Sequence, residues 1–395
     1  MPRVVLKPRR ARPFFGMHPW VFAGAIAAVS GDPADGDVVD LVSHAGNFIA
    51  RGLYNSRSKL RVRLYTWAED VALDAGFFRA RLQSAIELRS EVLQLTGTGR
   101  ACRLVFSEAD GLSGVIVDQY DEWLALQITS LAIANRREMF ADLLTELLEP
   151  QGIYLRTERG IGQLEGLELQ DGTIRGTVGD SPIVIEEEDG LLFQVNLKEG
   201  QKTGFYLDQR DNHMVVATLA TGRRVLDGFC YTGGFSLHAA RAGAASVLGV
   251  DASESAITMA CENAEMNQVQ GVTFEQADVF DRMDALVADG QQFGMVILDP
   301  PRFARSEGAV EKAMRGYRRL STQALRLLEP AGILVMCCCT GLIGRDMLHE
   351  LLAQVAAEAR RPLQILESRG PAPDHPVSAA CPETAYLKCI ICRTG

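Results

Sequence analysis

The stretch RVLDGFCYTGGF (residues 224–235) decides the fold of the C-terminal half of this 395-residue chain. An apolar run ends at Asp227, and the paired glycines Gly233 and Gly234 permit a tight turn that brings the backbone close to a ligand. Helical spacing follows in SLHAARAG, so the turn would open onto free amide donors at a helix N-terminus. The glycine spacing is not GxGxxG, and a dinucleotide pyrophosphate is therefore not favoured. The stretch predicts a strand, a ligand-binding turn and a helix.

Outward from this stretch, strand-like and helical segments alternate from about residue 222 to the C-terminal end. The alternation predicts an α/β domain of the Rossmann-like kind, with a parallel-rich sheet and helices on both faces. Ligands of such sheets bind outside the carboxyl ends of the strands. Three further strand-like runs end at Asp251, Asp278 and Asp299. We expect Asp251 to hold the ribose hydroxyls of a ligand and Asp278 to meet its adenine amino group; the alternative is that each aspartate only caps a helix.

The aspartates at four successive strand ends resemble those of the class I S-adenosylmethionine-dependent methyltransferases. At the fourth strand end the sequence continues Asp299-Pro300-Pro301. The two prolines predict a rigid, extended turn, because each fixes its own backbone and restricts the residue before it. The turn is similar to the loop that presents the acceptor base in these enzymes. The resemblance implies S-adenosylmethionine as the cofactor.

Three consecutive cysteines end the next apolar run, at positions 337, 338 and 339. Side chains alternate along a strand, so Cys337 and Cys339 share one face and Cys338 points to the other. The three thiols therefore cannot form one tetrahedral site, and we expect no metal. Cys337 and Cys338 are interpreted as small buried hydrophobes. Cys339, at the end of the strand, is the candidate nucleophile: a thiolate that adds to carbon 6 of a pyrimidine makes carbon 5 nucleophilic.

The first 185 residues differ in composition from the rest. Short apolar runs broken by Gly, Asp, Pro and Asn predict a small barrel over residues 1–70, and mixed helical and strand patterns predict an α+β unit over 71–185. The net charge is −10, but residues 1–70 carry +4 and the remainder −14. Local basic patches contact phosphates, so the acidic total does not exclude RNA. The Glu186–Glu188 run near the next boundary is interpreted as a solvated face.

Over its whole length the chain resembles the bacterial large-subunit (23S) ribosomal RNA cytosine-C5 methyltransferases. The resemblance implies a PUA RNA-binding domain (1–70), a central α+β domain (71–185) and a methyltransferase domain (186–395). It makes Cys339 and Asp299 catalytic residues and 23S ribosomal RNA the partner. The motifs that carry it are HPWVFAGAI (18–26), EADGL (108–112), KTGFYLDQRDN (202–212), FCYTGGF (229–235), ILDPPRF (297–303), CCTG (338–341) and DHP (374–376). The cofactor pocket it implies consists of Tyr206, Asp208, Gln209, Arg210, Asp227, Tyr231, Gly233, Asp251, Asp278 and Asp299.

Several alternatives stay open at this stage. Asp208 and Arg210 could form an ordinary surface pair, His375 is equally structural or functional, and the CxxC at Cys389–Cys392 is interpreted as strand packing. The base that removes the carbon-5 proton is unassigned, and a homodimer is left open. The rival functions are methylation of a nitrogen of an RNA base and RNA binding without catalysis. No apolar run approaches the roughly 20 residues of a membrane span, and we expect a cytoplasmic protein.

Overall fold

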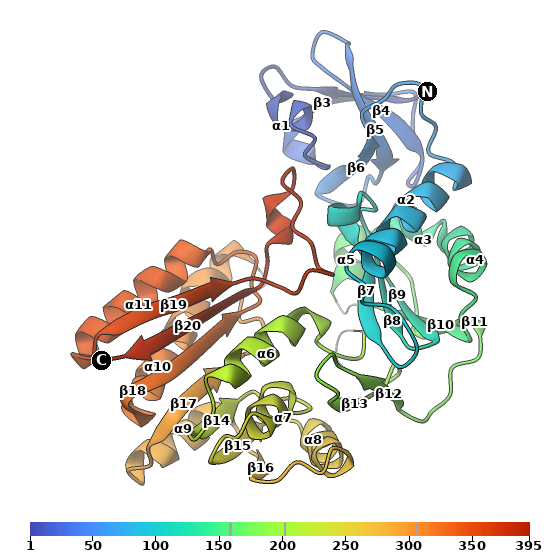
Figure 1. Cartoon of the computed structure of the whole chain (residues 1–395). Coiled ribbons are helices and arrows are strands. Elements are labelled where there is room, and N and C mark those ends of the chain that lie inside the picture. The colour runs from blue at the N-terminus through green and yellow to red at the C-terminus, as the bar shows by residue number, and fades with distance from the viewer. Residues whose placement is uncertain (158–159, 201–202, 305) are drawn as a thin grey trace. The chain divides into compact units, whose positions relative to one another are not determined.

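The computed structural model describes residues 1–157, 160–200, 203–304 and 306–395 (Figure 1). The chain forms two compact units. Unit 1 comprises residues 1–185, 195–207 and 373–384, and unit 2 comprises residues 186–194, 208–372 and 385–395. Within the described ranges, no helix is long and apolar enough to cross a membrane.

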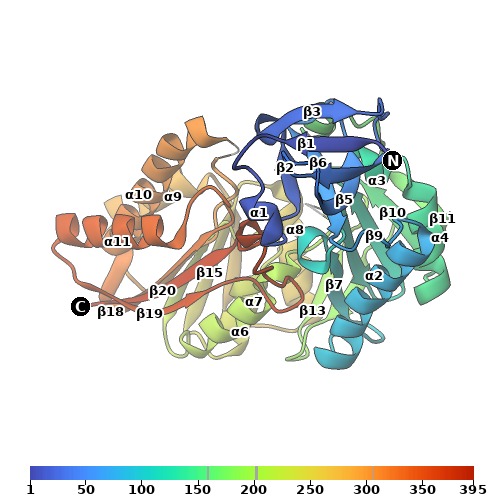
Figure 2. The ribbon, with the colours of Figure 1, turned by 90° about the horizontal axis from the view of Figure 1, so that it is seen from above.

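Unit 1 begins with a six-stranded sheet, the strand-rich module expected for residues 1–70. Figure 2 shows β1, β2, β3 and β6 of this sheet beside the short helix α1 (Arg12–Phe15). Its core is apolar and includes Val4, Leu41 and Val62. In sheet order the strands are β2 (Trp20–Phe22), β6 (Leu60–Thr66), β5 (Phe48–Tyr54), β4 (Val38–Val42), β1 (Arg3–Leu6) and β3 (Ile26–Ser30).

A second, five-stranded sheet completes unit 1 together with helices on one side. Asp74 caps the first of these helices by accepting a hydrogen bond from the Phe77 amide at 2.9 Å. In sheet order the strands are β11 (Gly172–Gly176), β10 (Gly152–Arg156), β9 (Trp123–Ile128), β8 (Val115–Tyr120) and β7 (Ala101–Phe106). The helices are α2 (Ala75–Glu87), α3 (Leu131–Ala134), α4 (Arg137–Leu148) and α5 (Ile161–Glu165).

Ion pairs join the two sheets inside unit 1. Arg63 of β6 contacts Glu108 at 3.2 Å and Glu165 at 3.1 Å, and all three side chains are largely buried. The Tyr65 hydroxyl donates to the Ser113 carbonyl at 2.6 Å. Buried charges of this kind are costly to separate, because each would lose its partner. The boundary proposed at residue 70 therefore runs through a single compact unit, and the three-domain division remains a proposal.

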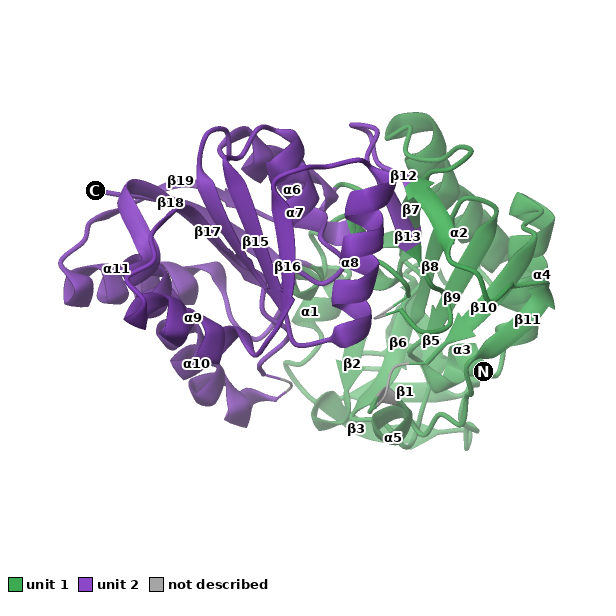
Figure 3. Ribbon diagram, turned by 90° about the horizontal axis from the view of Figure 1, so that it is seen from below, with its two compact units in different colours: residues 1–185, 195–207, 373–384 green, residues 186–194, 208–372, 385–395 purple. Residues whose placement is uncertain are grey.

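Unit 2 contains the parallel-rich sheet expected for an α/β methyltransferase (Figure 3). Strands β14, β15, β16, β17 and β18 run parallel, and β20 and β19 add antiparallel pairings at one edge. In sheet order they are β16 (Val272–Gln276), β15 (Ser246–Asp251), β14 (Arg224–Gly228), β17 (Phe293–Leu298), β18 (Leu328–Cys338), β20 (Lys388–Thr394) and β19 (Leu363–Arg369). The helices are α6 (Arg210–Thr218), α7 (Gly234–Arg241), α8 (Glu254–Met266), α9 (Val279–Ala288), α10 (Val310–Leu327) and α11 (Arg345–Ala359).

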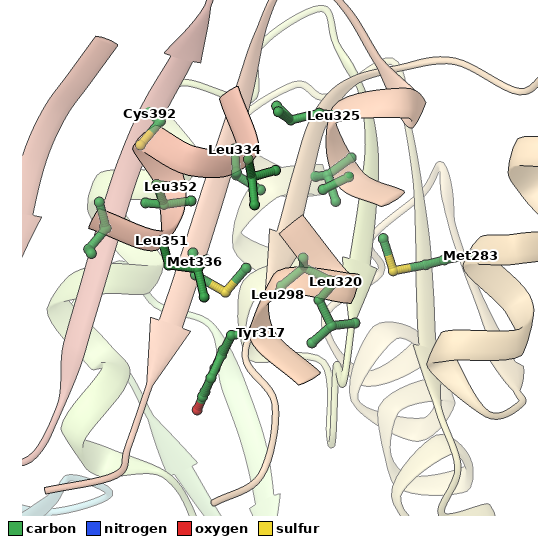
Figure 4. Close-up of a cluster of buried hydrophobic side chains, with 14 of the residues drawn as sticks. Met283, Leu298, Tyr317, Leu320, Leu325, Leu334, Met336, Leu351, Leu352 and Cys392 are labelled. Atoms are coloured by element: carbon green, nitrogen blue, oxygen red, sulfur yellow. The ribbon is translucent and has the colours of Figure 1, made fainter. Parts of the chain in front are cut away.

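Both faces of this sheet are buried, and β18 supplies alternate side chains to each. Leu334, Met336 and Cys338 pack with residues of α9, α10 and α11, as Figure 4 shows for Leu334 and Met336 beside Tyr317. Ile333, Val335 and Cys337 belong to the cluster on the other face. Two-sided burial explains why the strand reads as one continuous apolar run. A two-stranded sheet of β12 (Ile183–Glu186) and β13 (Leu192–Val195) lies where the chain first passes between the units.

Candidate active site

The turn after β14 has a strained backbone. Phe229 has φ of 68° and Tyr231 φ of 48°, a left-handed conformation that side chains other than glycine rarely adopt. Gly233 follows with φ of 92° and is the N-cap residue of α7. The amides of Phe229 and Cys230 donate to the Val250 carbonyl at 2.8 and 3.1 Å, which fastens the turn to the end of β15. Strain of this kind persists where the surrounding structure holds it, and it concentrates at ligand sites.

Asp251 ends β15 directly beside this turn. Its Oδ2 accepts a hydrogen bond from the Tyr231 amide at 3.0 Å, and its Oδ1 accepts one from the Ser253 amide at 2.9 Å. The side chain is half-buried rather than enclosed. A carboxylate held by two amides and still open on one side is placed to accept hydrogen bonds from a diol.

Asp227 is fully buried at the end of β14. Its Oδ2 accepts a hydrogen bond from the Ser236 hydroxyl at 2.6 Å, whereas its Oδ1 has no hydrogen-bond partner among the described residues. Burial raises the pKa of Asp227 from 3.8 to about 7; the negative charges of Asp299 and Asp251 add to the rise, and the Ser236 hydrogen bond opposes it. Three predicted carboxylates therefore act on one another at the strand ends, and a cationic group placed there would relieve their repulsion.

Asp278 differs from these carboxylates in its exposure and in its hydrogen bonding. It is exposed, and it caps α9 by accepting a hydrogen bond from the Asp281 amide at 3.1 Å. Asp278 therefore does cap a helix, as the alternative interpretation of the sequence proposed. Contact with adenine remains a proposal for this residue.

The segment before α6 reaches the loop after β17. Gln209 donates from Nε2 to Oδ2 of Asp299 at 2.9 Å, and its own Oε1 accepts from Asn212 at 2.6 Å. Asp208 accepts a hydrogen bond from the Tyr386 hydroxyl. Asp208 and Arg210 are 2% and 4% exposed, so the interpretation of these two residues as a surface pair is wrong.

Tyr206 and Lys202 belong to the same predicted motif, KTGFYLDQRDN (202–212). Tyr206 is half-buried and lies in the 195–207 segment of unit 1, whereas the other predicted pocket residues belong to unit 2. Lys202 lies outside the described residues.

The three consecutive cysteines occupy three different environments. Cys337 and Cys338 are fully buried on opposite faces of the sheet, which confirms their interpretation as packing residues. The pKa of Cys337 is raised by its hydrogen bond with Cys389 and by burial. Cys339 follows the end of β18 and is only half-buried, and its Sγ lies 4.0 Å from the Pro300 carbonyl oxygen. Cys339 thus meets the loop that begins at Asp299, and it is the one of the three thiols that is not fully buried.

Sequence reasoning missed Lys388, at the start of β20. Its side chain is buried and donates from Nζ to the carbonyls of Thr340 at 2.8 Å and Tyr386 at 3.0 Å. Burial lowers the pKa of Lys388, and interaction with the Cys338 and Cys339 thiols acts in the opposite direction. A single lysine at the head of the apolar run KCIIC was the available signal.

The weaker candidates from the sequence have structural surroundings. His375 is buried in unit 1, with Nδ1 2.9 Å from Oδ1 of Asp374 and its ring against Phe106. Asp374 in turn accepts hydrogen bonds from the Arg103 amide, through Oδ2 at 2.9 Å, and from Arg89, through its carbonyl at 2.8 Å. These contacts favour the structural reading of the DHP motif. Cys389 and Cys392 are fully buried in β20, as expected for packing.

Comparisons with known proteins identify the family of the chain. A family profile described as S-adenosylmethionine-dependent methyltransferase matches residues 179–393, and a PUA-like domain profile matches residues 4–67. Ribosomal RNA large subunit methyltransferase I of Aeromonas hydrophila is 37% identical over 99% of this chain and 98% of its own length. The protein of the same name from Pseudoalteromonas atlantica is 39% identical over 99% of both chains.

Solved structures show the same fold. A methyltransferase complexed with SAH superposes with a TM-score of 0.86 at 20% identity, covering all of both chains. A SAM-dependent methyltransferase from Streptococcus mutans gives 0.85 at 19% identity, again over all of both chains. Fold class and cofactor were therefore predicted correctly from the sequence.

Proposed function

This chain belongs to the ribosomal RNA large subunit methyltransferase I family of S-adenosylmethionine-dependent methyltransferases, and we propose that it methylates carbon 5 of a cytosine in 23S ribosomal RNA through a covalent adduct with Cys339. The observation that carries the proposal is the position of Cys339. It is the half-buried thiol at the end of β18, 4.0 Å from the carbonyl oxygen of Pro300. Methylation of a ring or exocyclic nitrogen uses the nitrogen lone pair and has no need of a thiol at this place.

The residues at the strand ends fit S-adenosylmethionine. Asp227 has a buried carboxylate oxygen without a partner among the described residues. Its pKa is raised to about 7, so a positive charge nearby would stabilise the ionised carboxylate. Asp251 would accept hydrogen bonds from the ribose. Gly233 has no side chain and adopts φ of 92°, so the backbone there can approach the cofactor closely. Tyr206, Asp208, Gln209, Arg210, Tyr231 and Asp278 complete the pocket in this proposal. The cofactor supplies an electrophilic methyl group.

Cys339 and Asp299 would activate the base. The thiolate of Cys339 adds to carbon 6, and the π electrons of the 5,6 double bond pass into the ring and make carbon 5 nucleophilic. Asp299 would hold the ring nitrogen or the amino group as charge builds there. After carbon 5 takes up the methyl group, loss of its proton to a base restores the double bond and expels the thiolate. We assign Lys388 a supporting charge, because its Nζ donates to the carbonyl of Thr340, the residue after Cys339.

RNA capture is assigned to residues 1–70 in this proposal. Arg9, Arg10 and Arg12 are exposed at the start of α1, and Phe15 and Phe22 expose 67% and 50% of their surface nearby in the sequence. Cationic side chains bind phosphates, and exposed aromatic rings stack on unpaired bases. A substrate made in the cytoplasm would place the enzyme there.

The function is tested with ribosomal RNA from a strain that lacks this protein. Purified protein and labelled S-adenosylmethionine are added, and the nucleosides are then digested and identified by mass spectrometry. We expect label in 5-methylcytidine. Label in an N-methylated nucleoside would instead support the nitrogen-methylating alternative, and RNA binding without any transfer would support a non-catalytic role.

A further inference from the structure

A buried cluster of metal-ligating side chains lies in unit 2, apart from the residues used above. Glu187 follows β12, His213 lies in α6 and His238 lies in α7. All three are buried, and one ligand atom from each lies within 4.8 Å of the other two. The interpretation of the whole Glu186–Glu188 run as a solvated face is therefore wrong for Glu187, which is 5% exposed.

The polar atoms of this cluster converge, and only some of them are paired. Nε2 of His238 lies 2.9 Å from Oε2 of Glu187, and Nδ1 of His213 lies 4.0 Å from Oε1 of Glu187. The 2.9 Å contact pairs His238 with Oε2 of Glu187, but Nδ1 of His213 and Oε1 of Glu187 remain buried and unpaired among the described residues. Buried polar groups are almost always paired, so these two facing atoms require an explanation.

The geometry points to a bound cation: we propose that Glu187, His213 and His238, with Asp189 as a fourth ligand, bind a zinc ion. Oδ2 of Asp189 lies 3.5 Å from Nε2 of His238. Zinc holds nitrogen and oxygen ligands at about 2.0–2.2 Å in a tetrahedron, which places the ligand atoms roughly 3.4 Å apart. The observed separations are 2.9 Å from Oε2 of Glu187 to His238, 4.0 Å from Oε1 of Glu187 to His213 and 3.5 Å from Asp189 to His238, so either oxygen of Glu187 lies in range for a shared ion.

The surroundings prepare the two imidazoles as ligands. Nδ1 of His238 lies 2.7 Å from the Gly234 carbonyl, an arrangement that leaves Nε2 for the metal. A Cβ atom at position 234 would lie 2.6 Å from the His213 ring, so glycine there makes room for this ring. Two carboxylates would balance the charge of the ion.

A metal-free alternative exists, and it makes a different prediction. Burial lowers the pKa of His238, but the carboxylates of Glu187 and Asp189 outweigh this effect and raise it above 6.5. A protonated His238 could therefore neutralise Glu187 as an ion pair. It would leave Nδ1 of His213 buried without a partner, which a zinc ion would not. The ion would join the turn after β12 to α6 and α7, the two helices that follow the segments predicted to bind the cofactor.

The test measures zinc content and zinc-dependent stability of the full-length protein. After dialysis against a chelator, zinc chloride is titrated by calorimetry, and the bound metal is counted by mass spectrometry. We expect the wild type to bind one more equivalent than the double variant His213→Asn, His238→Gln, and zinc to raise the melting temperature of the wild type alone. His44→Gln is the matched control, because His44 is an exposed histidine of unit 1. The His44→Gln protein should still bind the additional zinc equivalent.

A second group, His18, Cys381 and Glu383 in unit 1, could also attract zinc. Cys381→Ser should therefore leave the proposed equivalent in place. Cobalt gives a readout on the wild type that does not depend on any variant folding. Cobalt bound only by nitrogen and oxygen shows no thiolate-to-metal charge-transfer band. A wild type in which every bound cobalt equivalent shows such a band, or which binds no zinc saturably, would overturn the proposal, as would an unchanged stoichiometry in the folded double variant.

Discussion

Gln209 donates a hydrogen bond from Nε2 to Oδ2 of Asp299 over 2.9 Å, and this bond links the segment before α6 to the loop after β17. The same amide accepts from Asn212, so its orientation is held from both ends. Gln209, first proposed as a cofactor contact, is thus also a positioning residue for the carboxylate proposed to hold the cytosine.

Replacing Gln209 by Ala should lower kcat roughly 10- to 100-fold, because a hydrogen bond to a charged group contributes about 1.5–3 kcal/mol. The KM for S-adenosylmethionine should change much less. Gln209→Glu puts a second carboxylate against Asp299, and its activity should recover in part at acidic pH as one of the two protonates. Steady-state kinetics across pH measure both effects. An unchanged kcat in Gln209→Ala would remove this role.

Cys339→Ala should abolish methyl transfer and retain cofactor binding, because the proposed cofactor contacts come from other strand ends. Cys337→Ala and Cys338→Ala serve as controls: they leave small cavities in the core, so they should lower the melting temperature while methylation continues. RNA with 5-fluorocytosine at the target should trap a covalent adduct, since fluorine cannot leave as a proton. Peptide mapping of the adduct to any cysteine other than 339 would refute the assignment.

Asp251→Ala should weaken S-adenosylmethionine binding by about 1–3 kcal/mol, the cost of leaving hydrogen-bond donors without their partner. Asp251 also accepts hydrogen bonds from the Tyr231 and Ser253 amides, so part of the loss would come from a looser turn. Asp251→Asn, which keeps one acceptor oxygen, should lose less. Calorimetry measures both, and full affinity in folded Asp251→Ala would exclude the residue from the pocket.

Affinity for S-adenosylmethionine should rise with pH through the pKa of Asp227, which is about 7 in the free protein. The cofactor carries positive charge, so it favours the ionised carboxylate and releases a proton when it binds below that pKa. Binding should therefore tighten between about pH 6 and about pH 8, by at most tenfold per pH unit. Calorimetry in buffers of different ionisation enthalpy counts the released proton. Asp227→Asn should show a flat profile, and a flat profile in the wild type would contradict the role of Asp227.

Reversing the charges of Arg9, Arg10 and Arg12 to Glu should weaken RNA binding and flatten its salt dependence, because fewer counterions are released. Cofactor affinity should stay the same. Lys312→Glu, an exposed lysine of α10 in unit 2, is the control and should have little effect. Filter binding across salt concentrations gives the slopes; identical slopes in the triple variant and the wild type would assign RNA capture to another surface.

The fold of unit 2 could be predicted because its signals are local. Asp227, Asp251 and Asp299 each follow an apolar run, and glycines mark the turn after the first of them. The packing roles of Cys337 and Cys338 followed from their place in an apolar run, because cysteine behaves there as a small buried hydrophobe, and strand alternation gave their faces. Lys388 and Glu187 were not found, because burial depends on segments far away in the sequence. A lysine or glutamate that pairs at long range looks like any solvated charge until the chain is folded.

The DHP segment has a consequence for how this protein is made. Asp374 completes the hydrogen bonding of Arg89 and of the Arg103 amide inside unit 1, yet it is synthesised 271 residues after Arg103. At about 5–20 residues per second, the ribosome reaches it only after roughly 15–55 s. Unit 1 therefore waits, with buried groups unmatched, until nearly the whole polypeptide has been translated. A nascent chain stalled before residue 373 would be a substrate for chaperones, although both sheets of unit 1 are already encoded in it.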